Sequence, residues 1–209
     1  MINEIIRYLK YILYIPFALV TFFVIRIISN LHLIKFNFIP SERIGHMAME
    51  IELYLSQKKK SSFHLLAPQK IIANNFLLKL IKKKLILLPP EFMFLLIKLN
   101  HLIGNNKHLL VLTPESASGD RDMSNILDKT KPNLNFNKEE IQKGESFLSQ
   151  INTSLYNYIC IHVRDENYLR KTFPDDVNLN RHSHRNCDIS NYTDTINFLL
   201  DQNFTVIRM

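Results

Sequence analysis

The chain has 209 residues, of which 46% are hydrophobic and 22% charged, so it can bury a core and is not a disordered polymer. Its formal net charge of +7 favours contact with anionic partners. The sequence holds two cysteines, which excludes a disulfide framework, and no glycine-rich loop of the P-loop or dinucleotide-binding type.

The N-terminal residues 2–34 are predicted to form an apolar helix, in which residues 11–25 are an uninterrupted apolar run. As a helix, that run would be about 22 Å long, against roughly 30 Å for the hydrocarbon core of a bilayer. No small-residue cleavage site follows it, which argues against a cleaved signal peptide. Three placements stay open: an interfacial anchor, a membrane span and a helix packed on the protein. We expect residues 1–34 to associate with a membrane.

The lysines gather at residues 58–60 and 79–84, and three explanations stay open for them. They could be solvated helix ends or contacts to an anionic membrane surface, because basic segments near an apolar anchor add membrane affinity. The third is nucleic acid. We expect no such partner, because the sequence has no recognisable nucleic-acid-binding fold and no platform of arginines and aromatic residues.

Residues 35–113 alternate between strand and helix patterns. Alternation of this kind predicts a mainly parallel sheet covered by helices. The expected strands are 35–39, 63–67, 85–88 and 108–113. An amphipathic helix is expected to start near Ile44, with Met47, Ala48, Ile51 and Leu55 on its apolar side, and two further helices are expected at 69–84 and 91–103.

The polar stretch 114–137 is longer than most connections and suggests a substrate loop or a flexible one. Asn137, followed by Lys-Glu-Glu, is predicted to cap a helix that runs to about residue 151. We expect this helix to be the hinge between an N-terminal α/β lobe, residues 35–152, and the start of a second lobe, residues 153–209.

The second lobe is predicted to contain a strand from residue 155, a loop, a helix at 189–202 and a strand at 204–209. One β-α-β unit has too few strands for a parallel sheet. We therefore expect 153–209 to be the beginning of an incomplete, Rossmann-like lobe.

The stretch around Arg164 is the strongest candidate for a site. Period-two alternation puts Cys160, His162 and Arg164 on one face, with Arg164 at or just beyond the carboxyl end of the strand. Ligands bind at this edge of open α/β sheets, and a guanidinium there can hold a phosphate or carboxylate through two parallel bonds. A surface arginine at a strand end is the alternative.

Three segments together resemble a bacterial family classed as glycosyltransferases. They are 43–55, beginning Arg-Ile-Gly-His, then Ile161-His-Val-Arg-Asp, and 182–192, beginning His-Ser-His-Arg-Asn, with the last strand. The His-Val-Arg-Asp piece is more distantly similar to the His-x-Arg-Arg-x-Asp motif of α-1,6- and O-fucosyltransferases, whose arginine binds the donor diphosphate. Asp165 stands where that motif has its second arginine, so the fucose donor does not carry over. The resemblance covers about residues 36–209.

This resemblance implies a membrane-associated, GT-B-like α/β enzyme with two lobes that moves a sugar from a nucleotide-sugar donor. The acceptor would be a cell-surface glycan or its precursor, or a lipid-linked acceptor, and the place of work the cytoplasmic face of the inner membrane. No cofactor is expected beyond the nucleotide sugar as co-substrate. Sequence of the family continues past the point where this chain stops, so we expect a partial product.

Glycosyl transfer needs cationic support for the leaving diphosphate and a group that accepts the acceptor's proton. We expect donor binding by His162, Arg164, Arg185, Asp188 and Tyr192. His46, Glu50 and Asp165 are the candidate bases, and the sequence does not choose among them. Arg43 and Gly45 are expected to line the cleft. No D-x-D pair precedes a suitable strand end, which favours a mechanism without a metal.

Three other functions stay open. His182, His184, Cys187 and His162 are zinc-ligand types, but their spacing matches no standard zinc framework, and no metal is expected. A Ser-His-Asp triad would lack the usual G-x-S-x-G elbow. The chain could also be a non-catalytic membrane-surface protein or an inactive fragment.

Overall fold

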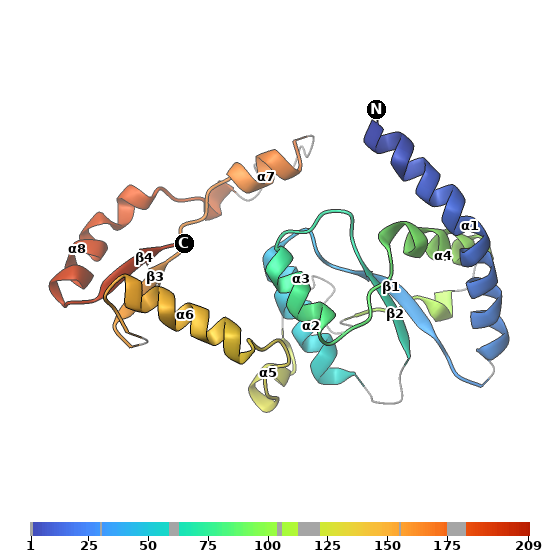
Figure 1. Ribbon diagram of the computed structural model, residues 1–209, viewed down its shortest axis with the longest axis horizontal. Coiled ribbons are helices and arrows are strands. Elements are labelled where there is room, and N and C mark those ends of the chain that lie inside the picture. The colour runs from blue at the N-terminus through green and yellow to red at the C-terminus, as the bar shows by residue number, and fades with distance from the viewer. Residues whose placement is uncertain are drawn as a thin grey trace. The chain divides into compact units, whose positions relative to one another are not determined.

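The computed structural model describes residues 2–29, 31–58, 63–103, 106–112, 122–154, 156–174 and 183–209. It shows a mixed α/β protein that divides into two compact units, Met1–Asn135 and Phe136–Met209 (Figure 1). The expected lobes, 35–152 and 153–209, stay a prediction. The division by contacts falls one helix earlier in the chain, because helix α6 (Lys138–Gln150) groups with the second unit.

The first unit is built on two parallel strands, β1 (Lys35–Ile39) and β2 (His64–Pro68), which pair from Lys35 with His64 to Ile39 with Pro68. Single parallel bridges extend this pair on both sides, Phe36 with Leu109 and Leu66 with Leu87. Among the described residues, the predicted strands 85–88 and 108–113 are therefore present only as these bridges, and residue 113 lies outside the described residues. Numbered along the chain, the four segments lie in the order 3-2-1-4, the order of a doubly wound fold.

Helices cover both faces of this small sheet (Figure 1). Strand residues alternate between the two faces: Phe36 packs on one side and Ile39 on the other. Helices α2 (Ile44–Gln57) and α3 (Asn75–Lys82) cover the face of Ile39, where the core contains Met47, Ile51, Tyr54, Leu66 and Ile81. Helices α1 (Ile2–Ile28) and α4 (Pro90–Leu102) cover the other face, where the core contains Ala18, Phe22, Ile25, Ala67, Met93 and Leu96.

Two helices of this unit differ from the prediction. The helix expected at 69–84 begins only at Asn75, because the side chain of Asn74 caps it by accepting a 2.8 Å hydrogen bond from the backbone N–H of Leu77. In α2, Met47 and Ile51 are buried as expected, whereas Ile44 in its first turn is exposed.

Helix α1 has two apolar faces and belongs to the first unit. Its inner face completes the core with Ala18, Phe22 and Ile25, which are at most 2% exposed. The residues that we call the outer face are each at least 60% exposed: Leu9, Ile12, Leu13, Val20, Phe23 and Ile27. By length and composition, the segment Leu9–Ile28 is apolar enough to cross a membrane, so α1 could anchor the chain to one.

The second unit holds the parallel strands β3 (Tyr158–Ile161) and β4 (Thr205–Arg208). Asn137 and Glu140 form a full capping box at the start of α6, which confirms the predicted cap. The helix predicted at 189–202 is present as a 3₁₀ turn, Ile189–Tyr192, followed by α8 (Thr193–Asp201). Two short helices, α5 (Ile126–Lys129) in the first unit and α7 (Asn167–Thr172) in the second, lie where loops were expected.

Candidate functional site

At the carboxyl edge of the β3–β4 pair, the segments that carry two predicted donor-binding residues, Arg164 and Asp188, meet. Strand β3 ends at Ile161, so Arg164 lies just beyond its carboxyl end, as predicted, while the expected strand alternation stops before His162. The backbone N–H of Cys187 donates a 3.0 Å hydrogen bond to the carbonyl of Arg164. This bond fixes the segment that carries Asp188 against the loop after β3.

Asp188 has a structural task at this edge. Its carboxylate accepts a 2.8 Å hydrogen bond from the backbone N–H of Ser190 and so caps the 3₁₀ turn that leads into α8. Hydrogen bonds from Ser190, and then the positive charge of Arg208 at the end of β4, lower the pKa of Asp188. The carboxylate therefore stays charged and also contributes negative charge to the edge where an anion is expected.

Asp165 is occupied by local structure. Its two carboxylate oxygens accept hydrogen bonds from the backbone N–H and the side-chain amide of Asn167, at 3.0 and 2.6 Å, at the start of α7. A carboxylate that holds a helix start in this way is a weaker candidate for a general base. The remaining predicted donor residues, His162, Arg185 and Tyr192, are exposed.

The zinc alternative finds no support among the described residues. There, no three histidine, cysteine, aspartate or glutamate side chains gather closely enough to hold a metal ion. Of the four residues proposed as zinc ligands, His182 lies outside the described residues.

In the first unit, His46 and Glu50 form a pair on α2. Nδ1 of His46 lies 2.8 Å from Oε1 of Glu50, which is the distance of a direct hydrogen bond. The side chain of Glu50 is 13% exposed and that of His46 is 31% exposed. A carboxylate oxygen without a proton only accepts, so Nδ1 is the donor to Glu50 in this bond, and Nε2 is the ring nitrogen that Glu50 does not contact. The structure thus joins two of the three candidate bases into one group.

This pair follows the carboxyl end of β1, which has a special place in the strand order. β1 lies between β2 and the segment of Leu109, where the chain order of the sheet reverses. Ligands of open α/β sheets bind outside the carboxyl ends of the strands at this reversal. Arg43 and Gly45 are both exposed there. A Cβ added at Gly45 would meet nothing within 4 Å, so packing in the protein does not require this glycine.

Ser41 holds the same edge in place. Its buried hydroxyl donates a 2.7 Å hydrogen bond to the carbonyl of Ile71, and its backbone N–H donates a 3.0 Å bond to Oε1 of Gln69. The carbonyl of Ser41 in turn accepts from the N–H of Ala73 at 2.7 Å. The loops after β1 and β2 are therefore joined to each other directly.

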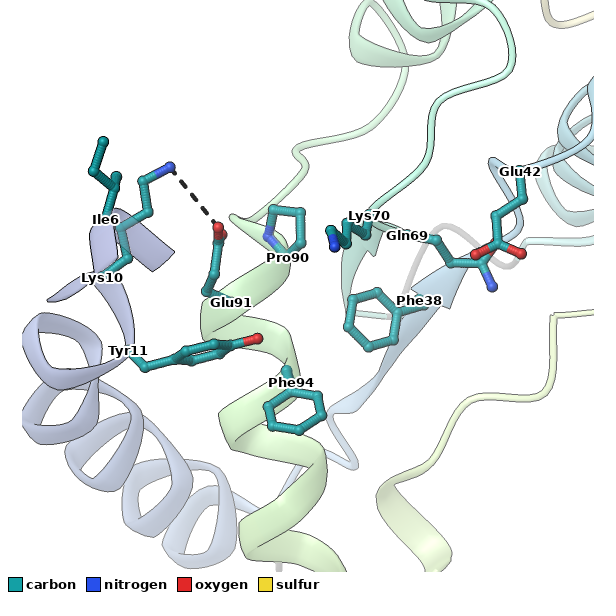
Figure 2. Close-up of a pocket in the computed structure, with 10 residues that line it drawn as sticks. All are labelled: Ile6, Lys10, Tyr11, Phe38, Glu42, Gln69, Lys70, Pro90, Glu91 and Phe94. Atoms are coloured by element: carbon teal, nitrogen blue, oxygen red, sulfur yellow. Dashed lines mark ion pairs between the residues drawn. The ribbon is translucent and has the colours of Figure 1, made fainter. Parts of the chain in front are cut away.

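A pocket of about 590 Å³ opens beside these loops and was missed by the sequence reasoning (Figure 2). Its walls come from α1, the first turns of α4, and the ends of β1 and β2; they are Ile6, Lys10, Tyr11, Phe38, Glu42, Gln69, Lys70, Pro90, Glu91 and Phe94. No motif marks these residues, because they come from separate parts of the chain. The one available signal is that residues 38–42 and 69–70 lie at or just beyond the ends of two predicted strands.

Comparison with known proteins adds no relative, because no family model, no curated protein and no solved structure matches this chain.

Proposed function

We propose that this chain acts in glycosyl transfer, as a GT-B-like protein that moves a sugar from a nucleotide-sugar donor to a cell-surface glycan, its precursor or a lipid-linked acceptor. The observation that carries the proposal is the His46–Glu50 pair, 2.8 Å apart, just after the carboxyl end of β1. It supplies the basic group that the reaction needs.

His46 would act as the general base. Its Nδ1–H donates to Glu50, so Nε2 can accept the proton of an acceptor hydroxyl as that oxygen attacks the sugar carbon. The carboxylate of Glu50 would then stabilise the imidazolium that forms, in the way that a buried acid supports a catalytic histidine. Oxygen gains the bond to the sugar, and the bond from the sugar to the diphosphate breaks.

Arg164 would support the diphosphate that leaves. Its position past the end of β3 suits contact with a phosphate, and the bond from Cys187 N–H to its carbonyl fixes the local backbone. A planar guanidinium binds two phosphate oxygens at once. Because the sequence has no glycine-rich phosphate loop, cationic side chains such as that of Arg164 would have to bind the phosphates.

Turnover by the full chain in detergent tests this proposal, with radiolabelled guanosine, uridine and cytidine nucleotide sugars and a membrane lipid extract as acceptor. His46→Gln should lower the rate by roughly 10²- to 10⁴-fold, the usual contribution of a general base. Glu50→Gln should lower it less, because the amide still binds the ring. His101→Gln, on the exposed end of α4, is the matched control. Wild-type turnover in His46→Gln would refute the role of this pair.

A second function, that of a non-catalytic membrane-surface protein, is favoured by the exposed outer face of α1. The same preparation separates the two functions. A protein that binds vesicles, but neither binds nor turns over any of the nucleotide sugars, supports this second function or an inactive fragment, and removes glycosyl transfer by this chain.

A further inference from the structure

The pocket beside α1 has an apolar side and a polar side. Figure 2 shows the rings of Tyr11 and Phe94 together, with the paired charged ends of Lys10 and Glu91 away from them. Phe38 and Lys70 also line the pocket. Tyr11 and Phe94 pack against each other with ring centroids 5.6 Å apart. A volume of about 590 Å³ is within the range of small-molecule sites, which are mostly apolar with a few placed polar groups.

The polar side carries charges of both signs. Lys10 and Glu91 lie 3.8 Å apart, beyond a direct hydrogen bond, and Lys10 remains about half exposed. Lys70 is exposed. The ammonium group of Lys70 suits a phosphate, whereas the carboxylates of Glu42 and Glu91 accept hydrogen bonds and so suit hydroxyl groups. The complementary head group therefore has both phosphate and hydroxyls.

The pocket adjoins the outer face of α1. Ile6 lines the pocket and is itself 47% exposed. Leu9 and Leu13, three and seven residues further on, share its side of the helix and belong to the outer face. An apolar tail that enters past Ile6 would thus remain in contact with apolar side chains from the pocket to the outer face.

We propose that this pocket binds a lipid whose head group carries phosphate and hydroxyl groups. The tail packs on Tyr11, Phe38 and Phe94, the phosphate is bound by Lys70, and the carboxylates accept the hydroxyls. Two sources share this chemistry, a hydroxyl-bearing phospholipid and a prenyl-phosphate-linked sugar. The second would be the lipid-linked acceptor and in that respect rests on the proposed function, whereas binding in the pocket does not.

Calorimetric titration of the full chain with soluble lipids tests the proposal without any nucleotide sugar. The probes are dihexanoyl phosphatidylglycerol and a ten-carbon prenyl phosphate-linked glucose, both below their critical micelle concentrations. Comparison with dibutyryl phosphatidylglycerol measures how much the tail contributes to affinity, since each additional buried methylene should tighten binding roughly four-fold. Comparison with dihexanoyl phosphatidylcholine, which has no hydroxyl group, measures how much the hydroxyls of the head group contribute to affinity.

The variants are Lys70→Ala, Lys70→Arg and, as the matched control, Lys131→Ala, an exposed lysine of the same unit outside the pocket. Lys70→Ala should weaken binding of the hydroxyl-bearing lipids at least ten-fold, because it removes charge-assisted bonds to the phosphate. Lys70→Arg should retain most of the binding, and Lys131→Ala all of it. Melting curves recorded alongside show that each variant is folded.

Whichever soluble lipid binds more tightly identifies the source of the ligand. Equal binding by Lys70→Ala and the wild type would mean that the lipid rests on the surface of α1, and would overturn the proposal. So would binding that neither the tail length nor the hydroxyls affect, or no binding of either probe. Because no donor is present, failure here leaves the proposed function to its own test, and loss of turnover in His46→Gln leaves lipid binding unchanged.

Discussion

Arg26 donates a 3.0 Å hydrogen bond from Nη2 to the side-chain carbonyl of Asn100, which joins α1 to α4. Asn100 is fully buried, and the guanidinium of Arg26 also lies over the ring of Phe22, 5.0 Å from its centroid. Within the first unit, this bond and the inner face of α1 attach a strongly apolar helix to the sheet.

Asn100→Ala should therefore weaken the attachment of α1. The change leaves the partly buried guanidinium without this acceptor, which costs about 1–3 kcal/mol of the free energy of unfolding. Denaturant melts of the full chain in mild detergent measure it. Lys98→Ala, on the exposed side of the same helix, is the control and should change little. An unchanged midpoint in Asn100→Ala would show that α1 is not held by this bond.

The outer face of α1 should bind lipid. Replacing Val20 and Phe23 by lysine should lower binding to neutral phosphatidylcholine vesicles roughly ten-fold or more, because two apolar side chains lose burial in the bilayer. Ile86→Lys is the control, since Ile86 is also apolar and 89% exposed but lies outside α1. Vesicle flotation in high salt isolates the apolar contribution, because salt screens attraction to charged head groups. Equal flotation of all three proteins would contradict lipid contact by this face.

Arg164 should distinguish a donor site from a structural arginine. If it binds a diphosphate, Arg164→Ala should lose about 1.5–3 kcal/mol of binding free energy, or roughly 10- to 150-fold in affinity. Arg164→Lys keeps the charge but loses the planar fork, so it should lose nearly as much. Calorimetric titration with nucleoside diphosphates and nucleotide sugars measures both variants. Unchanged affinity with an intact fold would remove Arg164 from the site.

The free energy of unfolding of the first unit should decrease as the pH falls below about 6.5, because the pKa of two of its histidines is lowered in the folded state. Burial lowers the pKa of His108, and burial followed by the charges of Lys58 and Lys35 lowers the pKa of His64. The unfolded chain then takes up protons first, near pH 6.5, so stability is present above that pH and is lost as pH falls towards the folded-state values.

Each histidine can contribute up to about 1.4 kcal/mol per pH unit inside this window. Melts between pH 8 and 5 measure the slope. His108→Gln and His64→Gln should each flatten it, and the double variant should flatten it more. His101→Gln, on an exposed site, is the control. A slope that both single variants share with the wild type would assign the dependence to other groups.

The second unit should open more readily than the first. Among its described residues, the buried hydrophobic side chains are Leu148 and Leu169, whereas the first unit holds two full clusters. Few buried apolar contacts give low local stability. Hydrogen exchange should be faster in β3, α8 and β4 than in β1 and α4. Equal protection in the two units would contradict this expectation.

The sequence by itself determined the elements whose causes are local. Asn137 and Glu140 lie three residues apart, which is the spacing of a capping box, and α6 begins there. Strand β1 has the predicted bounds 35–39, because its short apolar run ends at Pro40. His46 and Glu50 are four residues apart, so a helix alone brings them together. Both were predicted as candidate bases, but not as a pair.

Only the tertiary structure decided what depends on contacts between distant segments. In the part of the chain that the structure describes, the strands expected at 85–88 and 108–113 are reduced to single bridges, because pairing depends on how neighbouring segments meet rather than on apolar content. Whether α1 packs on the protein was open, and its packing on α4 buries one apolar face and leaves the other exposed. The pocket joins Tyr11, Phe38, Gln69 and Phe94, which no periodicity relates, since a cavity exists only where separate elements pack against one another.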